Sequence, residues 1–251
     1  MDSLHALKEA FLFPINFCPP QEVLEYNGWL TDPTLRLVTF PRHPEIRLPF
    51  AIDLFDQASA HAQLLNVPWF AVGNSDILLT LEWQKEIEAG MKGSDEVLIF
   101  PRTDFDRDPH GTSPRNLTIH HRGQDLFVCK VETWERIRRF FQNYFLGEAY
   151  WDNIFTALFL THAKGFIYLN PMGLCLHERH ERRWGNSPFH YHNRLLANGP
   201  DMISTLRWKY FHHGWMLRRE EAGRLLHSQE IRQLIEETFI TPMPEEVEFA
   251  Q

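Results

Sequence analysis

The sequence predicts an α/β fold, in which a mostly parallel central sheet is flanked by helices and followed by a helical C-terminal extension. Short β-rich segments alternate with segments of helical periodicity, which is the pattern of such a fold. Hydrophobic residues make up 43% of the 251 residues and aromatic residues 14%, enough for one large core. We therefore expect a single domain over residues 1–200, with residues 201–251 packed on it.

The first third of the chain sets the predicted topology. Residues 11–17 are apolar and aromatic, residues 34–40 alternate, and residues 67–72 are compact and apolar, so we expect three strands. Residues 21–30 suit a short helix, and residues 51–65 place their apolar side chains on one helical face. The order strand, helix, strand, helix, strand predicts parallel pairing.

The middle of the chain alternates less clearly. We expect a helix over 81–91, a strand over 96–100 and a strand over 126–131. Residues 101–122 are polar and interrupted by Pro and Gly, which predicts a long loop, and long loops in compact domains are often functional.

The second half is mainly helical in its pattern. Thr133 is a suitable N-cap for a helix that carries aromatic residues at helical spacing up to Phe145 and ends near Gly147. The remaining predicted elements are a helix over 151–159, a strand over 165–170 and an amphipathic helix over 228–239.

Composition narrows the function classes. The formal net charge of -8 makes nucleic acid an unlikely partner, because binding to phosphate backbones usually requires a basic excess. Three widely spaced cysteines do not form a disulfide framework and favour reduced, buried thiols. The N-terminus lacks the pattern of a signal peptide, and the apolar runs are shorter than the ~20 residues of a transmembrane segment. We expect a cytoplasmic protein without a transmembrane segment.

A polar triplet, Asn74, Ser75 and Asp76, follows the strand predicted over 67–72. Ligands of open α/β sheets bind at the carboxyl ends of strands, and a carboxylate there can hold a divalent cation against a diphosphate. The alternative is that the triplet is a turn and a helix cap.

A second cluster is rich in histidine and arginine. Imidazole binds metals and arginine binds phosphate, so the segment suits a site for a metal and a diphosphate. A solvated polar segment is the alternative, and structural zinc is disfavoured because no second cysteine pair is present. The residues concerned are His177, His180, Arg182, His190 and His192.

Two further carboxylates are candidates for catalysis. Asp152 follows Trp151 at the start of a predicted helix, where it could act as a base for an acceptor hydroxyl while the indole stacks on a sugar or base. Asp125 precedes the strand over 126–131. The alternatives are an acidic first helical turn and an exposed turn acid, respectively.

Taken in order, these motifs resemble those of nucleotide-diphospho-sugar transferases with the GT-A glycosyltransferase fold. They are Asn-Ser-Asp-Ile, Gly-x-Asp-Leu-Phe-Val, Gly-x-x-x-Trp-Asp-Asn and His-x-x-His-x-x-x-Trp, and the resemblance runs from about residue 51 to 192. It implies a GT-A-like, Rossmann-like domain that binds a nucleotide-sugar donor and a divalent metal, Mn or Mg. Asn74, Ser75 and Asp76 match the family's Asp-x-Asp motif, with Asn in place of the first acid.

The resemblance also implies roles for the other residues. Asp76 would bind the metal, with His177 or His180 as a further ligand, and Arg182 and Trp151 would contact the donor. Asp152 would be the general base, and Asp125 would lie near the acceptor or sugar. The implied function is sugar transfer to the hydroxyl of a glycan or other acceptor. The alternatives are a metal-dependent hydrolase or nuclease that uses residues 177–192, and a non-catalytic binding module.

The segment over 201–215 is aromatic and basic. The functional interpretations of this segment are an acceptor surface, a dimer contact or a membrane-facing patch. In the simplest interpretation it is a helix packed on the sheet with its basic side exposed.

Overall fold

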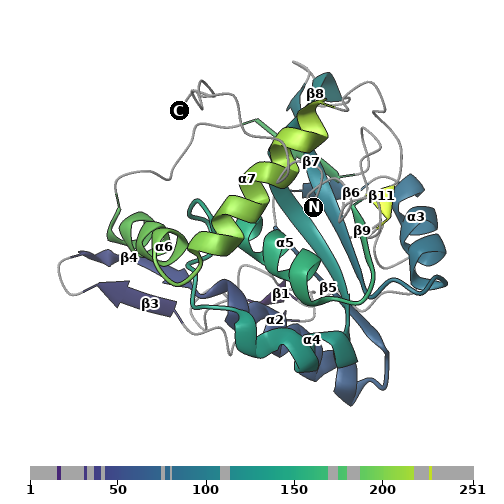
Figure 1. Ribbon diagram of the computed structural model, residues 1–251, viewed down its shortest axis with the longest axis horizontal. Helices are drawn as coiled ribbons and strands as arrows, with labels where there is room; N and C mark the ends of the chain where they lie inside the picture. Colours follow the sequence, from purple (N-terminus) through teal and green to yellow (C-terminus); the bar gives the residue numbers. More distant parts are fainter. Residues whose placement is uncertain are drawn as a thin grey trace.

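The protein is an α/β structure with a mixed, curled sheet and helices on both of its faces (Figure 1). A computed structural model describes residues 16–17, 31–32, 37–40, 43–74, 77–79, 81–107, 114–168, 175–179, 187–217 and 226–227. Within these ranges it contains six α-helices and one main sheet of seven strands.

The main sheet is built around β7 and β8. Its strands are β5 (Trp69–Gly73), β6 (Ile77–Leu79), β7 (Val97–Arg107), β8 (Pro114–Lys130), β9 (Phe166–Tyr168), β10 (Cys175–Glu178) and β11 (Leu226–His227). β8 pairs with β5 on one edge and with β7 on the other. The far edge of β7 is shared by β9 near its start and by β10 near its end.

The prediction of a mostly parallel sheet is wrong for the described residues. Among the described strands of the main sheet only β7 with β9 and β7 with β10 are parallel pairs, whereas β5 with β8, β7 with β8, β6 with β10 and β9 with β11 are antiparallel. The physical reason is the connection between β7 and β8, which spans only residues 108–113. Parallel neighbours need a crossover of a dozen or more residues, so a short connection dictates an antiparallel hairpin.

The long loop predicted over 101–122 is largely sheet instead. β7 continues to Arg107 and β8 begins at Pro114, and the two strands stay paired beyond Pro101. Pro101 pairs with Gln124 whereas Arg102 pairs with His120, so residues 121–123 form a bulge in β8. Such bulges bend a strand and re-aim its side chains.

Smaller pairings lie outside the main sheet. β1 (Asn16–Phe17) pairs in parallel with β2 (Thr31–Asp32), and β3 (Leu37–Phe40) forms an antiparallel ribbon with β4 (His43–Pro49). β3 confirms part of the strand predicted over 34–40. The helices predicted over 21–30 and 228–239 lie outside the described residues.

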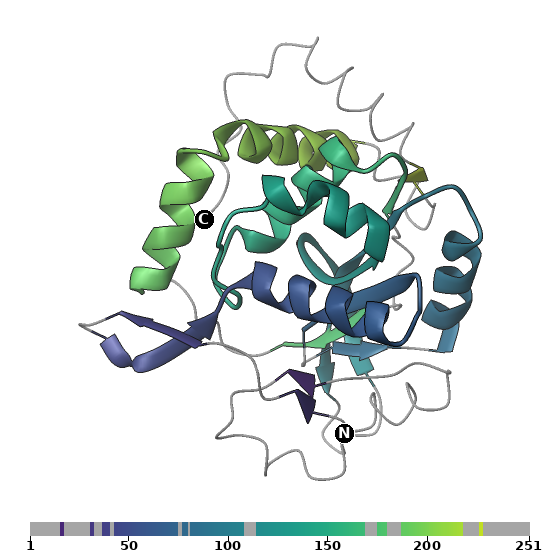
Figure 2. The ribbon, with the colours of Figure 1, turned by 90° about the horizontal axis from the view of Figure 1, so that it is seen from below.

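Helices pack on both faces of the sheet (Figure 2). They are α2 (Ala51–Leu64), α3 (Leu81–Met91), α4 (Val131–Ile137), α5 (Trp151–His162), α6 (Pro188–Asn198) and α7 (Met202–Leu217). α2, α4 and α5 contribute to the larger core cluster, and α7 packs on α5 and adds Trp208 to that cluster. α3 covers the opposite face through Ile87.

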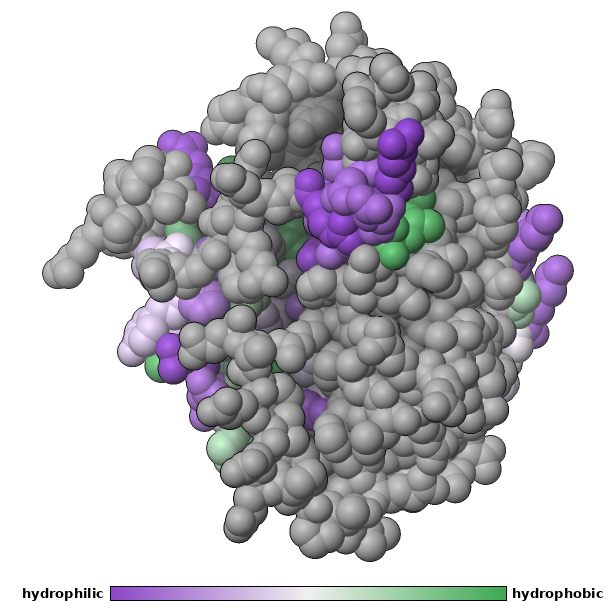
Figure 3. Space-filling view, turned by 90° about the horizontal axis from the view of Figure 1, so that it is seen from above, coloured by the Kyte–Doolittle hydropathy of each residue, from purple (hydrophilic) through white to green (hydrophobic). Residues whose placement is uncertain are grey.

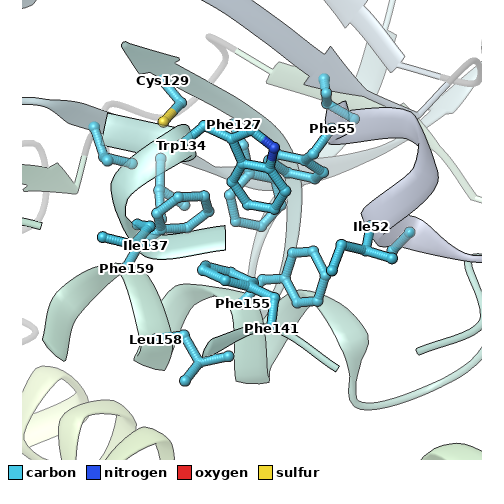
Figure 4. Close-up of a cluster of buried hydrophobic side chains, with 14 of the residues drawn as sticks. Ile52, Phe55, Phe127, Cys129, Trp134, Ile137, Phe141, Phe155, Leu158 and Phe159 are labelled. Carbon is cyan, nitrogen blue, oxygen red and sulfur yellow. The ribbon is translucent and has the colours of Figure 1, made fainter. Parts of the chain in front are cut away.

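Alternation along β7 and β8 explains this two-sided core. Val97 and Ile99 belong to the larger cluster, whereas Leu98 and Phe100 belong to the smaller one, as the period of two in a strand requires. The larger cluster is dominated by stacked and edge-on aromatic rings around Phe55 (Figure 4). The sequence predictions for α2, α3 and α5 are confirmed.

The prediction of a helix from Thr133 to Phe145 is wrong in its extent. The observed helix, α4, begins at Val131, ends at Ile137, and is followed by a single 3-10 turn, Arg138–Phe140. Tyr144 and Phe145 are nevertheless buried. They are held outside a helix by α6, where the buried Asn193 side chain accepts from the backbone N–H of Phe145 and donates to its carbonyl oxygen.

Side-chain hydrogen bonds of this kind replace the missing helical ones. α6 was not predicted, although Ser187 as N-cap followed by Pro188 is a helix start signal. Gly147 has a φ of +80°, in agreement with the left-handed conformation expected there.

No helix within the described ranges is long and apolar enough to cross a bilayer.

The aromatic core predicts a large asymmetry between two positions on α2. Phe55 is fully buried, whereas Leu64 is 82% exposed. We expect Phe55→Ala to lower the free energy of unfolding by about 3–5 kcal/mol, because it removes a ring and leaves a cavity. Leu64→Ala should change it by less than about 0.5 kcal/mol. Urea denaturation followed by tryptophan fluorescence measures both, and equal losses would contradict this account of the core.

Candidate functional site

A polar cluster lies where the second half of β7, the bulge of β8, strand β10 and the start of α5 meet. It contains Arg102 and Asp104 from β7, Asp125 from β8, Asp152 from α5 and His177 from β10. Three of these residues, Asp125, Asp152 and His177, were predicted site residues. The structure brings all three into one connected group.

Asp125 is held at the end of the bulge. Its backbone carbonyl oxygen accepts from the backbone N–H of Asn74 at 3.0 Å, which ties the residue after β5 to β8. Its side chain is 4% exposed, and Oδ2 lies 3.5 Å from Nη1 of Arg102. Asp125 is therefore a buried carboxylate beside a cation, not the exposed turn acid of the alternative interpretation.

Asp152 sits in the first turn of α5 and faces the bulge. The backbone N–H of Gln124 donates to Asp152 Oδ2 at 3.2 Å, and Asn153 Nδ2 donates to Gln124 Oε1 at 3.0 Å. Burial raises the pKa of Asp152 from 3.8 to about 7, and the negative charge of Asp125 adds to this. Hydrogen bonds from the backbone and the charge of Arg102 oppose the rise. A carboxyl group whose pKa lies near neutral pH suits general acid or base catalysis.

His177 is oriented by a carboxylate. Its Nδ1 lies 3.1 Å from Oδ1 of Asp104, and the same oxygen lies 3.0 Å from Nε of Arg102. With the Nδ1 proton donated to Asp104, Nε2 carries the lone pair that can bind a metal or accept a proton. A carboxylate that fixes the ring in this way is a common partner of metal-binding histidines.

The described residues on either side of Ser75 and Asp76, namely Asn74 and Ile77, are anchored at this cluster. Asn74, the first residue of the predicted donor-binding triplet, is bonded to Asp125, and Ile77, the residue after the triplet, is paired with His177 in the β6–β10 ladder. Ser75, Asp76, His180 and Arg182 lie outside the described residues. Within the described part of the chain no three His, Cys, Asp or Glu side chains converge as metal ligands. The metal site with Asp76, His177 and His180 stays a prediction.

Trp151 does not contribute a binding surface. It is 5% exposed and packs against Phe127 and Phe155, with ring centroids 5.7 and 5.8 Å away. The interpretation of its indole as a platform for a sugar or base is therefore corrected. At the first position of α5 its side chain turns toward the sheet, so it anchors the helix that carries Asp152.

The other described histidines have separate partners. His190 lies on α6, where its Nδ1 is 3.6 Å from Oε2 of the buried Glu148. His192 Nε2 is 3.0 Å from the backbone carbonyl oxygen of Asn143. His177, His190 and His192 thus do not form a common metal site with one another, and His180 and Asp76, the other members of the hydrolase or nuclease interpretation, lie outside the described residues.

Sequence reasoning missed Arg102 and Asp104 because it assigned them to a loop. The alternation of Arg102 and Asp104 with the buried Thr103 and Phe105 was the signal for a strand with one polar face. The strand continues to an exposed ion pair between Arg179 and Asp106 at 2.8 Å. On the face seen from above in Figure 3, one protrusion is formed by hydrophilic side chains, and further hydrophilic side chains lie toward both edges of the view.

Comparison of the chain with models of protein families, with characterised proteins and with solved structures gives no match. The function must therefore be argued from the chemistry and geometry of the cluster itself.

The raised pKa of Asp152 predicts a pH dependence of stability. The folded state holds this proton more tightly than the unfolded state, so the contribution is complete below about pH 4 and is lost as the pH rises through about 7. The loss has a slope of up to about 1.4 kcal/mol per pH unit in this window.

Asp152→Asn should flatten the curve of unfolding free energy against pH between these values. Urea titrations of both proteins at a series of pH values measure the difference. Parallel curves would show that Asp152 titrates near its ordinary pKa, and the environment described above would then be wrong.

Proposed function

We propose that the protein is a glycosyltransferase with a GT-A-like site, which transfers a sugar from a nucleotide-sugar donor to an acceptor hydroxyl with the help of a divalent metal. The observation that supports the proposal is that the two described residues on either side of Ser75 and Asp76 reach the cluster: Asn74 is bonded to Asp125, and Ile77 is paired with His177. Residues far apart in the sequence, which motif order alone grouped together, are thereby joined by main-chain hydrogen bonds and strand pairing.

One half of the reaction is stabilisation of the leaving group. Transfer breaks the bond between the anomeric carbon and the diphosphate, which leaves with an additional negative charge. Asp76, His177 and His180 are the proposed metal ligands, and Mn or Mg bound there would supply a Lewis acid for this charge. Arg182 is proposed to bind the diphosphate directly, since its guanidinium fits phosphate oxygens. Asn74 contributes an amide, not a second carboxylate.

The other half is activation of the acceptor. In the proposed step Asp152 takes the proton of the acceptor hydroxyl while its oxygen attacks the anomeric carbon, as in an inverting displacement. A pKa near 7 supports this role, because the carboxylate is then a competent base at neutral pH. Arg102, placed between Asp125 and Asp104, limits the repulsion among the carboxylates and keeps them in position.

Loss of the base should reduce turnover but not donor binding. We expect Asp152→Asn to lower kcat by about 10²–10⁴-fold, because general base catalysis contributes factors of this size. The affinity for the donor should change little. Glu132→Gln is the matched control, since Glu132 is an exposed carboxylate on α4, away from the cluster. A transfer assay with release of nucleoside diphosphate gives kcat, and unchanged turnover in Asp152→Asn would rule out this residue as the base.

Donor binding can be tested without knowledge of the acceptor. A thermal-shift screen with UDP-, GDP-, CMP- and dTDP-sugars, with and without manganese, should raise the Tm for one nucleotide class, and more strongly with metal. Asp76→Ala should abolish the metal-dependent part. A shift from metal alone would favour a hydrolase or a structural metal, and no shift with any donor would favour a non-catalytic binding module.

A further inference from the structure

The described side chains of helix α7, residues 202–209, have their polarity inverted relative to a normal surface helix. Its inner side is formed by Ser204 and Thr205, which are buried, together with Trp208. Its outer side carries Met202, Ile203 and Leu206, which are 53%, 62% and 42% exposed. Surface helices normally turn such side chains toward the core, so an outward apolar stripe indicates a covering partner.

The inward polar groups have partners within the protein. Thr205 Oγ1 donates to the carbonyl oxygen of Ala197 at 2.7 Å, and the buried Tyr144 hydroxyl donates to Asp201 at 2.7 Å. The orientation of α7 is thus fixed by specific hydrogen bonds. A rotation that buried the apolar stripe would break them, so the stripe is a stable feature of the fold.

Cations border the apolar stripe. Helical spacing puts Lys209 on one flank of the stripe and Arg207 on the other, and Lys209 is exposed. Arg207 is fixed by a hydrogen bond of 2.8 Å from Nη1 to Thr161 Oγ1 at the end of α5. Long cationic side chains beside apolar ones are typical of helices that lie in a lipid–water interface.

A second cation, Arg139, extends the Arg207 flank beside the ring of His162. His162 stacks on Phe140 with ring centroids 3.8 Å apart. The guanidinium of Arg139 lies 4.9 Å from the centroid of the Phe140 ring. Arg207 and Arg139 both lower the pKa of His162, after the effect of burial, so the three groups lie within electrostatic reach of one another. Among the described residues no carboxylate forms an ion pair with Arg139 or Arg207.

We propose that the outer face of α7, with Arg139 and Arg207 along its flank, docks on an anionic lipid bilayer. Met202, Ile203 and Leu206 would enter the headgroup region, while the cations bind lipid phosphates. Charge complementarity favours this occupant over a second copy of the chain, because α7 packed on α7 would bring Arg139 and Arg207 of one copy close to those of the other. In Figure 2 the helix lies along one side of the described elements.

Co-sedimentation with phosphatidylcholine vesicles, with and without phosphatidylserine, tests the proposal on the full chain. Binding should require phosphatidylserine and weaken at high salt. Arg139→Gln/Arg207→Gln should weaken it about thirtyfold, about fivefold for each cation. Ile203→Ser/Leu206→Ser should weaken it at least tenfold. Leu64→Ser, at the exposed end of α2, is the apolar control and should bind like the wild type.

Three outcomes would overturn the proposal. They are absence of binding to either vesicle, equal binding with and without phosphatidylserine, and equal loss in Leu64→Ser and in the α7 variants. Sedimentation velocity is run in parallel. A dimer that Ile203→Ser/Leu206→Ser converts to a monomer would show that a second copy covers α7 instead. Circular dichroism melts of each variant test whether unfolding causes the loss of binding. Because the substituted side chains are at the surface, we expect each Tm to stay close to that of the wild type.

Discussion

The structure depends on strand β7, which is paired along both of its edges. β8 follows one edge through the whole hairpin, while β9 and β10 share the other. The first half of β7 is apolar on both sides and lies between the two helix layers, so it can be stable only if both faces are covered. The second half alternates between buried and polar residues as it leaves that sandwich. The change from core to polar site occurs within one continuous strand.

That transition explains why carboxylates can gather at the site. Asp104, Asp125 and Asp152 come from three different elements, and their mutual repulsion would separate them in a flexible loop. β7 places Arg102 between two of them, and the bulge of β8 turns Gln124 so that its backbone N–H binds the third. The helix that carries Asp152 is fixed by Trp151 in the aromatic core. Core packing and site geometry are thus linked through adjacent residues.

The docking face and the candidate site lie at opposite ends of α5. Asp152 is in its first turn, whereas His162 is at its last residue and contacts the cations beside α7. At 1.5 Å per residue these positions are about 15 Å apart along the helix axis. Binding of α7 to a surface would therefore leave the proposed transfer site uncovered. Because α5 is a rigid helix, it would also keep the distance between that site and the surface constant.

The sequence by itself determined the local elements with a strong period, namely α2, α3, α5 and the apolar halves of β7 and β8, and it identified Asp125, Asp152 and His177 as candidates. Only the tertiary structure decided the direction of strand pairing, the extent of the β7–β8 hairpin, the role of Arg102 and Asp104, and the placement of Trp151 in the core. The physical reason is the separation of the interacting residues along the sequence. Helical and strand periodicity depends on neighbouring residues, whereas strand register, ion pairing and burial depend on segments far apart in the chain. Asn193, for example, fixes Phe145 outside a helix although the spacing of the aromatic residues favours one.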